Sequence, residues 1–149
     1  IVGDGSETQK MIDYAIEKKL KICYKKNNLN FDIFFSSWMT DVTNIIAASD
    51  VVVLTSFNEG TPVSIIEAMA GSKACVSTNV GGVPYLIDDN VTGLLVGAKK
   101  SEQMVGKINE LISGKIDGYQ IARNAREEVS HYDKNEIIKQ WCQTINEFN

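Results

Sequence analysis

Two glutamates, Glu59 and Glu67, lie on either side of a sequence that can begin a helix. Between them, Gly60-Thr61-Pro62 follows an apolar run; threonine is favoured as a helix N-cap and proline at the first helical position. The first-turn N–H groups of such a helix, including those of Val63 and Ser64, have no partner inside the helix, and its dipole favours negative charge. We therefore expect an anion site here, for example for a diphosphate, and Gly60 would allow close approach to the backbone.

The two carboxylates are staggered along the axis of this predicted helix. Glu59 comes just before the predicted cap, and Glu67 lies more than one turn inside the helix, roughly 8 Å further along at about 1.5 Å per residue. Because a carboxylate accepts two or more hydrogen bonds, one could bind sugar hydroxyls while the other binds ribose hydroxyls. Taken singly, each glutamate also suits a helix that binds no ligand, Glu59 beside its N-terminus and Glu67 on its exposed face.

Short apolar segments recur at a spacing typical of alternating strands and helices. They cover residues 31–35, 51–54, 74–77 and 93–96. The run Val51–Leu54 is apolar on both faces, as required of a parallel strand covered by helices on two sides, so we expect it at the centre of the sheet. Residues Ile1–Gly5 are interpreted as the end of another strand and the turn after it. Residues 21–30 could end a helix or form a strand.

Helices are predicted between these strands and after them. The first begins at Ser6, which stands at capping-box spacing from Gln9. No strand is predicted after Gly97. The predicted helices cover residues 6–19, 41–48, 62–70, 101–113, 117–129 and 133–147. This order predicts an α/β fold, a Rossmann-like doubly wound parallel sheet with C-terminal helices, which binds ligands at the carboxyl ends of its strands.

The last predicted helix has one strongly apolar face. Asp133 and Glu136 suit its N-terminus. The apolar face consists of Ile137, Trp141, Ile145 and Phe148. A face of this kind needs a surface to cover it. We expect the core of this domain to cover it, and docking against a separate domain is the alternative.

Composition and charge limit the function classes. The net charge of −4 and the pI near 5.0 provide no general attraction for nucleic acid. The lysines between residues 18 and 26 are interpreted as a solvated helix face, and contact with anionic lipid or a partner is the alternative. Cys23, Cys75 and Cys142 suit neither a disulfide framework nor a metal site, so we expect reduced cytosolic thiols, with Cys75 in the core. No signal peptide or membrane span is predicted.

The segment from Glu59 to Ala70 resembles a motif of the retaining GT-B glycosyltransferases of the family 4 type, also called glycosyl transferases group 1. In that family, which includes bacterial mannosyl- and glucosyltransferases and glycogen synthases, two glutamates are separated by seven residues, as Glu59 and Glu67 are here. Further matches lie at residues 1–5, 48–51, 79–84 and 92–96. The similarity runs from residue 1 to about residue 97, in family order and at family-like spacing.

The resemblance implies that a hexose is transferred from a nucleotide-diphosphate sugar with retention of anomeric configuration, without a metal or another cofactor. Glu59, which matches the first family glutamate, would be the catalytic residue beside the transferred sugar. Glu67, which matches the second, would bind the ribose hydroxyls. The donor-binding positions between them, whose backbone would contact the sugar and the phosphates, are Gly60, Thr61, Pro62, Val63 and Ser64.

Two earlier segments belong to the implied donor site. Gly3 and Gly5 lie in the first matched turn. Residues 35–41 look like the family segment that cradles the base, which would place Met39 and Asp41 beside it. A core methionine and a helix cap are the alternative interpretations of these two residues.

The resemblance also implies the domain organisation. Residues 1–149 would be a single donor-binding domain, the C-terminal half of a GT-B fold, without its first strand and without the N-terminal domain that binds the acceptor sugar, lipid or glycan. The family usually places an Arg and a Lys against the donor diphosphate upstream of the matched segment, and Tyr85 stands where an acidic residue is frequent. We therefore expect weak donor binding and no transfer by this chain alone. The expected location is the cytoplasm, and peripheral contact with the inner face of a membrane is left open.

Three other functions are alternatives to sugar transfer. A dehydrogenase domain is suggested by Val2-Gly3-Asp4-Gly5, but Thr8 stands where the third glycine of a dinucleotide fingerprint would be. An epimerase or hydrolase of the same two-domain architecture would share the fold, which alone does not decide function. A non-catalytic nucleotide-binding domain is the third alternative, and the presence of both Glu59 and Glu67 argues against it.

Overall fold

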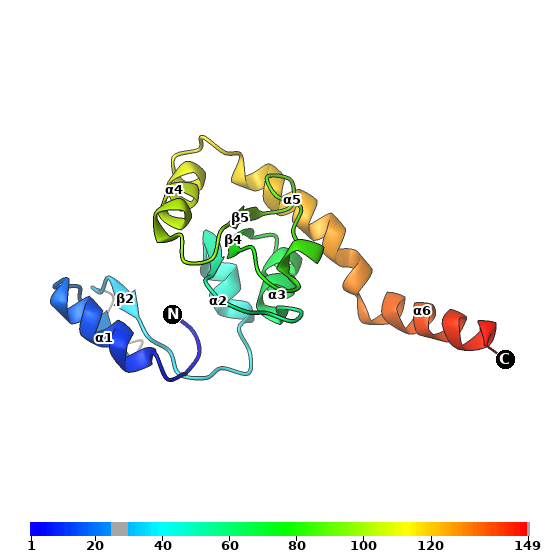
Figure 1. Ribbon diagram of the computed structural model, residues 1–149, viewed down its shortest axis with the longest axis horizontal. Helices are drawn as coiled ribbons and strands as arrows, with labels where there is room; N and C mark the ends of the chain where they lie inside the picture. The colour runs from blue at the N-terminus through cyan, green and yellow to red at the C-terminus, as the bar shows by residue number, and fades with distance from the viewer. Residues whose placement is uncertain (25–29, 149) are drawn as a thin grey trace. The chain divides into compact units, whose positions relative to one another are not determined.

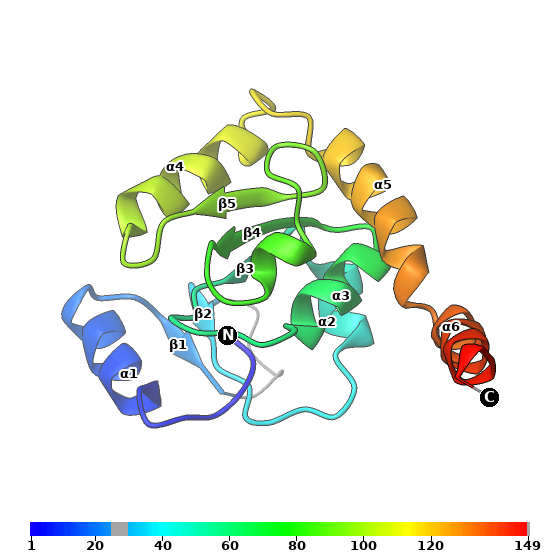
Figure 2. The ribbon, with the colours of Figure 1, turned by 45° about the vertical axis from the view of Figure 1, so that its right-hand side comes forward.

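The computed structural model describes residues 1–24 and 30–148. Contacts between Cα atoms divide the chain into two compact units, Ile1–Val42 and Thr43–Asn149. Figure 1 shows the chain with labels on most of its helices and strands, and Figure 2 also labels β1 and β3. Each unit is described by itself, and the prediction of one donor-binding domain over residues 1–149 stays a prediction.

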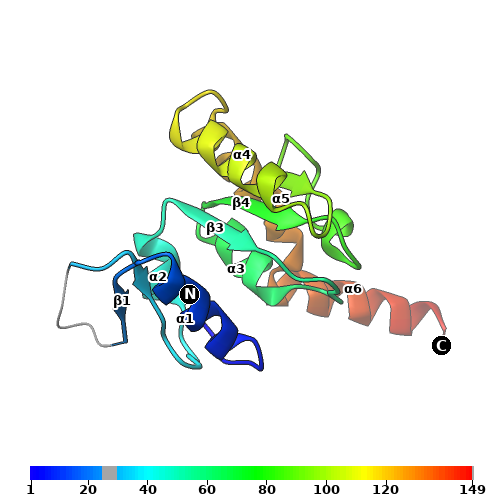
Figure 3. The same cartoon turned by 60° about the vertical axis from the view of Figure 1, so that its left-hand side comes forward.

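The first unit combines one helix with two short parallel strands. These are α1 (Thr8–Glu17), β1 (Ile22–Cys23) and β2 (Ile33–Phe34), and α1 packs beside β1 (Figure 3). The Phe35 N–H donates to the Cys23 carbonyl on one edge of β2. On the other edge, the Ile1 amino group donates to the Phe34 carbonyl at 2.7 Å and the Ser36 N–H donates to the Ile1 carbonyl at 2.9 Å. Ile1 thus bonds to β2 in a strand-like pattern, although it is not part of a regular strand.

The start of α1 differs from the prediction. The helix begins at Thr8 rather than Ser6, and its N-cap, Glu7, makes no side-chain capping bond. Instead, the Gly5 N–H donates to the Thr8 hydroxyl at 3.2 Å and the Thr8 N–H donates to the Gly5 carbonyl at 3.1 Å. Ser6 lies inside this turn, which prevents the predicted capping box. In the ambiguous stretch 21–30, Ile22 and Cys23 form a strand, and residues 25–29 lie outside the described residues.

The second unit is a three-stranded parallel sheet with helices on both faces. The strands are hydrogen-bonded in the order β3-β4-β5. The elements are α2 (Thr43–Ala48), β3 (Val51–Leu54), α3 (Val63–Ala70), β4 (Ala74–Thr78), η1 (Val83–Tyr85), β5 (Leu94–Val96), α4 (Ser101–Ile112), α5 (Gly118–Val129), η2 (Ser130–Tyr132) and α6 (Lys134–Glu147). Figure 2 shows α3 and α4 on opposite sides of the strands.

The central strand of this sheet is β4, not β3 as the sequence suggested. All residues of β4 are buried, whereas Val53 in β3 is 41% exposed. The run Val51–Leu54 is apolar on both faces. This pattern indicates that helices cover both faces of a strand, but it does not indicate which strands pair with it.

Two apolar clusters fill the two faces of the sheet. One gathers Ile65 and Met69 from α3, Cys75 from β4 and Ala125 from α5. The other includes Ala74 and Val76 of β4, Leu94 of β5 and Met104 of α4. Alternate residues of β4 thus enter opposite clusters, as the pleat of a strand requires. The doubly wound arrangement predicted from the sequence is confirmed.

The C-terminal helices begin and end close to the predicted positions. Asp117 caps α5 by accepting from the Gln120 N–H at 3.0 Å, and Asp133 caps α6 by accepting from the Asn135 N–H at 2.8 Å. Within the described residues, no helix is long and apolar enough to cross a membrane.

The apolar face of α6 is not covered by this unit's own core. No described residue of α6 is buried, and Trp141 and Phe148 are 65% and 86% exposed. The helix leads away from the sheet after η2 (Figure 1), so its stripe reaches neither apolar cluster. The prediction that this domain's core covers the stripe is therefore wrong for the described part of the chain.

Candidate functional site

The turn after β3 leads into α3 at the carboxyl edge of the sheet. Pro62 is the N-cap, with φ −74° and ψ 99°, and its carbonyl accepts from the Ile65 N–H at 3.0 Å. The helix thus begins at Val63, one residue later than predicted, and Thr61 makes no capping bond. The extended ψ places Pro62 outside the helix, where its carbonyl takes the first helical hydrogen bond. The predicted roles of Thr61 as N-cap and Pro62 as first helical residue are wrong by one position.

The N-terminus of α3 presents backbone donors to its surroundings. No hydrogen bond from the Val63 or Ser64 N–H to any described residue is formed. Both residues are exposed, and the exposed fraction of Val63 is 61%. Together with the positive end of the helix dipole, these donors can bind an anion without help from a side chain.

Glu67 lies on the same face of α3 as these donors. It is exposed and follows Ser64 by three residues and Val63 by four, and helical side chains tilt towards the helix N-terminus. The opposite face is fixed, because Ile65 and Met69 are 0% exposed in the apolar cluster. Among the described residues, no group forms a hydrogen bond or ion pair with the Glu67 carboxylate, which is free to bind a ligand.

Glu59 lies in the turn itself and is half-buried. Its carboxylate has no hydrogen-bond or salt-bridge partner within residues 1–24 and 30–148. The Glu59 main chain, in contrast, is held, because its carbonyl accepts from the Gly82 N–H at 3.1 Å. The buried Thr78, at the end of β4, donates its hydroxyl to the Ser56 carbonyl at 2.6 Å. The end of β4 and the loop after it therefore each contact the turn after β3 once.

Sequence reasoning did not assign these two contacts to the site. In the sequence, Gly82 belongs to one of the segments that match the family, and Thr78 lies outside them. The signal available in the sequence was the glycine pair Gly81-Gly82 directly after a buried strand. Adjacent glycines after a strand indicate a close approach of two backbones.

The other predicted site residues lie in the first unit. Gly3 has φ +110°, a conformation that favours glycine, and Gly5 donates to Thr8. Met39 is half-buried and Asp41 is exposed. The structure brings together Glu59, Glu67 and the residues between them. It does not place Gly3, Gly5, Met39 and Asp41 relative to that group, so their part in the site stays a prediction.

The thiols and acidic groups offer no second reactive centre at this edge. Burial raises the pKa of the Cys75 thiol to about 12, which keeps it protonated and unreactive at neutral pH, as expected for a core residue. Among the described residues, no three His, Cys, Asp or Glu side chains are grouped as a metal site would require.

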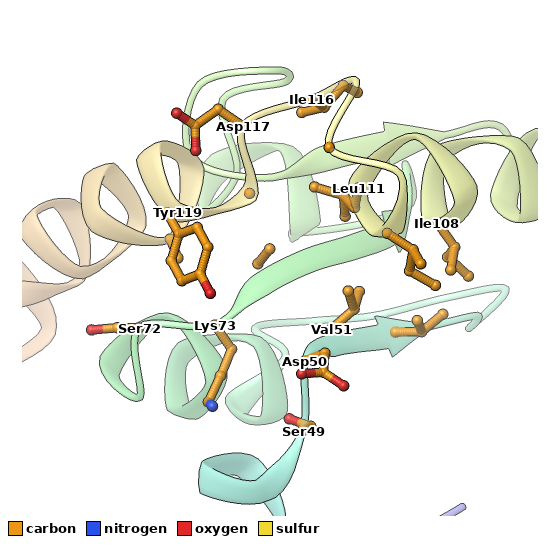
Figure 4. Close-up of a pocket in the computed structure, with 16 residues that line it drawn as sticks. Ser49, Asp50, Val51, Ser72, Lys73, Ile108, Leu111, Ile116, Asp117 and Tyr119 are labelled. Atoms are coloured by element: carbon orange, nitrogen blue, oxygen red, sulfur yellow. The ribbon is translucent and has the colours of Figure 1, made fainter.

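A pocket lies at the opposite edge of the same sheet. It has a volume of about 940 Å³ and is lined by Val51, Ile108, Leu111 and residues at the amino ends of β3 and β4 (Figure 4). Two of its polar side chains serve the fold, because Lys73 donates to the Ala47 carbonyl at 2.7 Å and Asp117 caps α5. Doubly wound sheets bind ligands at their carboxyl edge, so we place the candidate site at α3 and not in this pocket.

Comparison with known proteins gives consistent matches along the chain. Residues 1–128 match the family described as Glycosyl transferases group 1. The chain is 28% identical over 130 residues to the UDP-Gal:alpha-D-GlcNAc-diphosphoundecaprenol alpha-1,3-galactosyltransferase of Escherichia coli, covering 87% of this chain and 31% of that protein. It is 30% identical over 102 residues to the N,N'-diacetylbacillosaminyl-diphospho-undecaprenol alpha-1,3-N-acetylgalactosaminyltransferase of Campylobacter jejuni, covering 68% of this chain and 27% of that protein. The chain spans about a third of the length of these relatives.

Solved structures extend this similarity to the fold. Anabaena HepE in complex with UDP-glucose superposes with a TM-score of 0.83 at 25% identity, covering 98% of this chain and 40% of that one. The C-terminal domain of the Francisella tularensis protein LpcC superposes with a TM-score of 0.65 at 30% identity, covering 84% of this chain and 62% of that one. The predicted fold, a Rossmann-like C-terminal half of a GT-B fold, is confirmed.

Proposed function

Because this chain belongs to the family of glycosyl transferases group 1, we propose that it forms the nucleotide-sugar-binding part of a glycosyltransferase. The reaction is transfer of a hexose from a nucleotide-diphosphate sugar to an acceptor, with retention of anomeric configuration. One observation carries the proposal. The exposed N-terminus of α3 offers the Val63 and Ser64 N–H groups, with the carboxylates of Glu59 and Glu67, which no described residue binds, before and after them.

Each part of the donor has a matching group in this arrangement. The diphosphate binds at the α3 N-terminus, where two N–H donors and the helix dipole stabilise its negative charge. Glu67, one turn further along the same helix face, accepts hydrogen bonds from the ribose hydroxyls. Glu59, in the turn before the helix, lies beside the transferred sugar and is the catalytic residue. Gly60 and Thr61 are exposed and complete the surface that faces the sugar.

No metal ion is required by this scheme. In many phosphate sites a divalent cation neutralises the charge. Here the helix N-terminus supplies part of that neutralisation, and we propose that basic residues outside this chain supply the rest. Weak binding of the donor by the chain alone, and no transfer by it, follow from the same reasoning.

The names of the similar proteins indicate which class of donor and which class of acceptor to test first. HepE was solved with UDP-glucose and also with UDP, and the galactosyltransferase of Escherichia coli is named for UDP-Gal. We propose a uridine nucleotide as the first donor class. Two relatives are named for acceptors linked to diphosphoundecaprenol, which supports a lipid-linked acceptor, a cytoplasmic location and peripheral contact with a membrane for the protein that contains this chain.

Binding measurements on the 149-residue chain test the donor site directly. Ligand-observed NMR with UDP, GDP, ADP and their hexose conjugates would detect the weak binding we expect. We predict preferential binding of one nucleotide and its loss in Glu67→Ala, because the ribose hydroxyls lose a charged acceptor worth about 1.5–3 kcal/mol, roughly a tenfold or larger loss of affinity. Glu128→Ala is the matched control, since Glu128 is also an exposed helical glutamate but lies in α5.

Two results would contradict the assignment. Equal binding by the wild type and Glu67→Ala would remove Glu67 from the site. An epimerase or hydrolase of the same fold would bind the same nucleotides. Analysis of the products made by a form of the protein that turns over the nucleotide sugar distinguishes that alternative from transfer. Release of a free or epimerised sugar without any glycosylated acceptor would favour the alternative over transfer.

A further inference from the structure

We infer that the end of β4 and the loop after it position Glu59 for sugar transfer, with Thr78 and Gly82 as the positioning residues. This loop, residues 79–82, is called the β4 loop. The inference rests on the proposed function, because it assigns to the β4 loop a role in the geometry of the turn that contains Glu59. This turn, residues 56–60, is called the catalytic turn. Neither residue is placed in contact with the donor; both act through the main chain of residues 56–60.

Two hydrogen bonds fasten the catalytic turn at its two ends. At the start of the turn, the Thr78 hydroxyl donates to the Ser56 carbonyl at 2.6 Å. Near its end, the Gly82 N–H donates to the Glu59 carbonyl at 3.1 Å. Thr78 is only 4% exposed and belongs to the fully buried central strand β4. A bond from the most buried strand of the sheet thus fixes a turn that is otherwise partly exposed.

The glycines of the β4 loop lie against the backbone of the same turn. A Cβ atom added at Gly82 would lie 1.8 Å from the Gly60 carbonyl oxygen, and one added at Gly81 would lie 1.8 Å from the Glu59 carbonyl oxygen. Real Cβ atoms essentially never approach another heavy atom closer than 3.0 Å. Gly81 also has φ +51°, which other residues rarely adopt. Any side chain here would push the two backbones apart by about 1 Å or more.

At the other described glycines where an added Cβ atom would come closer than 3.0 Å to a neighbour, that neighbour is a side chain and not the backbone. At Gly93 the close contact would be with the side chain of Ile87, at 2.9 Å, and at Gly71 with the side chain of Ile46, at 2.7 Å. A side-chain end can rotate away from an added methyl group, whereas a carbonyl in a turn can move only with its backbone. Within the described residues, only Gly81 and Gly82 therefore fix backbone against backbone.

The fixed turn explains how Glu59 is held without a side-chain partner. Its carboxylate has no hydrogen bond to any described residue, so its position depends on its own main chain. Displacement of a reacting group by about 1 Å can reduce the rate by around 10²-fold. Glu67 and the α3 donors are held separately, through the burial of Ile65 and Met69. Disturbing the β4 loop should therefore reduce catalysis and spare nucleotide binding.

Four variants test whether the β4 loop affects catalysis separately from nucleotide binding. They are made in a form of the protein that turns over a nucleotide sugar. Gly82→Ala moves the Glu59 turn, and Thr78→Val removes the hydroxyl while keeping the shape of the side chain. Thr78→Ser restores the hydroxyl and serves as the conservative rescue. Gly93→Ala adds a methyl group at another tight glycine, at the amino end of β5, far from the turn along the strand. The readouts are kcat with UDP-glucose, GDP-mannose or ADP-glucose, whichever is turned over, the Kd of the matching nucleoside diphosphate, and the thermal midpoint.

We expect Gly82→Ala and Thr78→Val to lower kcat at least tenfold with a change in nucleotide Kd below threefold. Thr78→Ser should recover most of the lost kcat, and Gly93→Ala should keep it. The inference is overturned if Thr78→Val and Thr78→Ser have equal kcat, or if kcat and nucleotide affinity fall together in Gly82→Ala. If Gly82→Ala does not fold, the threonine pair alone decides. The proposed function fails by a different result, namely no transfer of sugar by the wild type from any of these donors.

Discussion

The two edges of the second unit's sheet differ in where their polar groups find partners. The amino edge carries a pocket of about 940 Å³, yet Lys73 and Asp117 in its lining are bound to the protein itself. The carboxyl edge carries backbone donors at Val63 and Ser64 and a carboxylate at Glu67 that no described residue satisfies. Unpartnered polar groups at a fixed geometry, rather than volume, mark the edge that binds a charged ligand.

The largest effect expected at the carboxyl edge is that of Glu59→Gln. The change keeps the size of the side chain but removes the negative charge beside the transferred sugar. We predict a fall in kcat of roughly 10²–10³-fold, the usual range for a lost electrostatic contact in the transition state. Nucleotide-sugar affinity should change only a few-fold, because the interaction develops in the transition state. Steady-state kinetics together with titration of the donor separate the two; equal losses in both would place Glu59 in ground-state binding.

A backbone change tests the anion site without altering any charge. Val63→Pro deletes the first N–H of α3, and proline is well tolerated at this position because Pro62 already has the extended ψ that a residue before proline prefers. We predict about a tenfold loss of UDP affinity, the equivalent of one charge-assisted hydrogen bond. Uridine, which lacks the diphosphate, should bind equally to both forms. Val63→Ala keeps the N–H and is the control; a matching loss there would implicate the valine side chain instead.

The smallest effect is predicted at the amino edge. Asp117→Ala removes the N-cap of α5, which should lower the free energy of unfolding by about 1 kcal/mol. Asp117→Asn keeps a capping oxygen and should retain most of that stability. Nucleotide binding should be the same in both variants, as measured by the NMR titration alongside denaturant unfolding. A selective loss of UDP binding in Asp117→Ala would move the ligand site to the amino edge and reverse the comparison.

Local patterns in the sequence were sufficient for most of the elements. The N-terminal role of Asp133 and the strand Val51–Leu54 were predicted at the observed positions, because caps and apolar runs act over a few neighbouring residues. The central position of β4 and the exposed face of α6 were not predicted. Both depend on which distant segments pair or pack, and the hydrophobic pattern of a segment does not contain that information.

The residues of the candidate site also fall into those that local sequence predicts and those that only the structure shows. Glu59, Glu67 and the residues between them form one continuous segment, so their relative placement follows from a single turn and helix. Thr78 and Gly82 act on that segment from about twenty residues away, and only the structure shows which atoms meet. Met39 and Asp41 belong to the other unit, and their proximity to the nucleotide remains a prediction from the family resemblance.

The two-sided character of α3 has a consequence for insertions and deletions. Each residue added to a helix turns everything after it by about 100°. One extra residue between Pro62 and Ile65 would send the side chains of Ile65 and Met69 out of the core or turn Glu67 away from the α3 N-terminus, since one rigid helix carries both faces. The length of this segment is therefore fixed by the two faces of one helix.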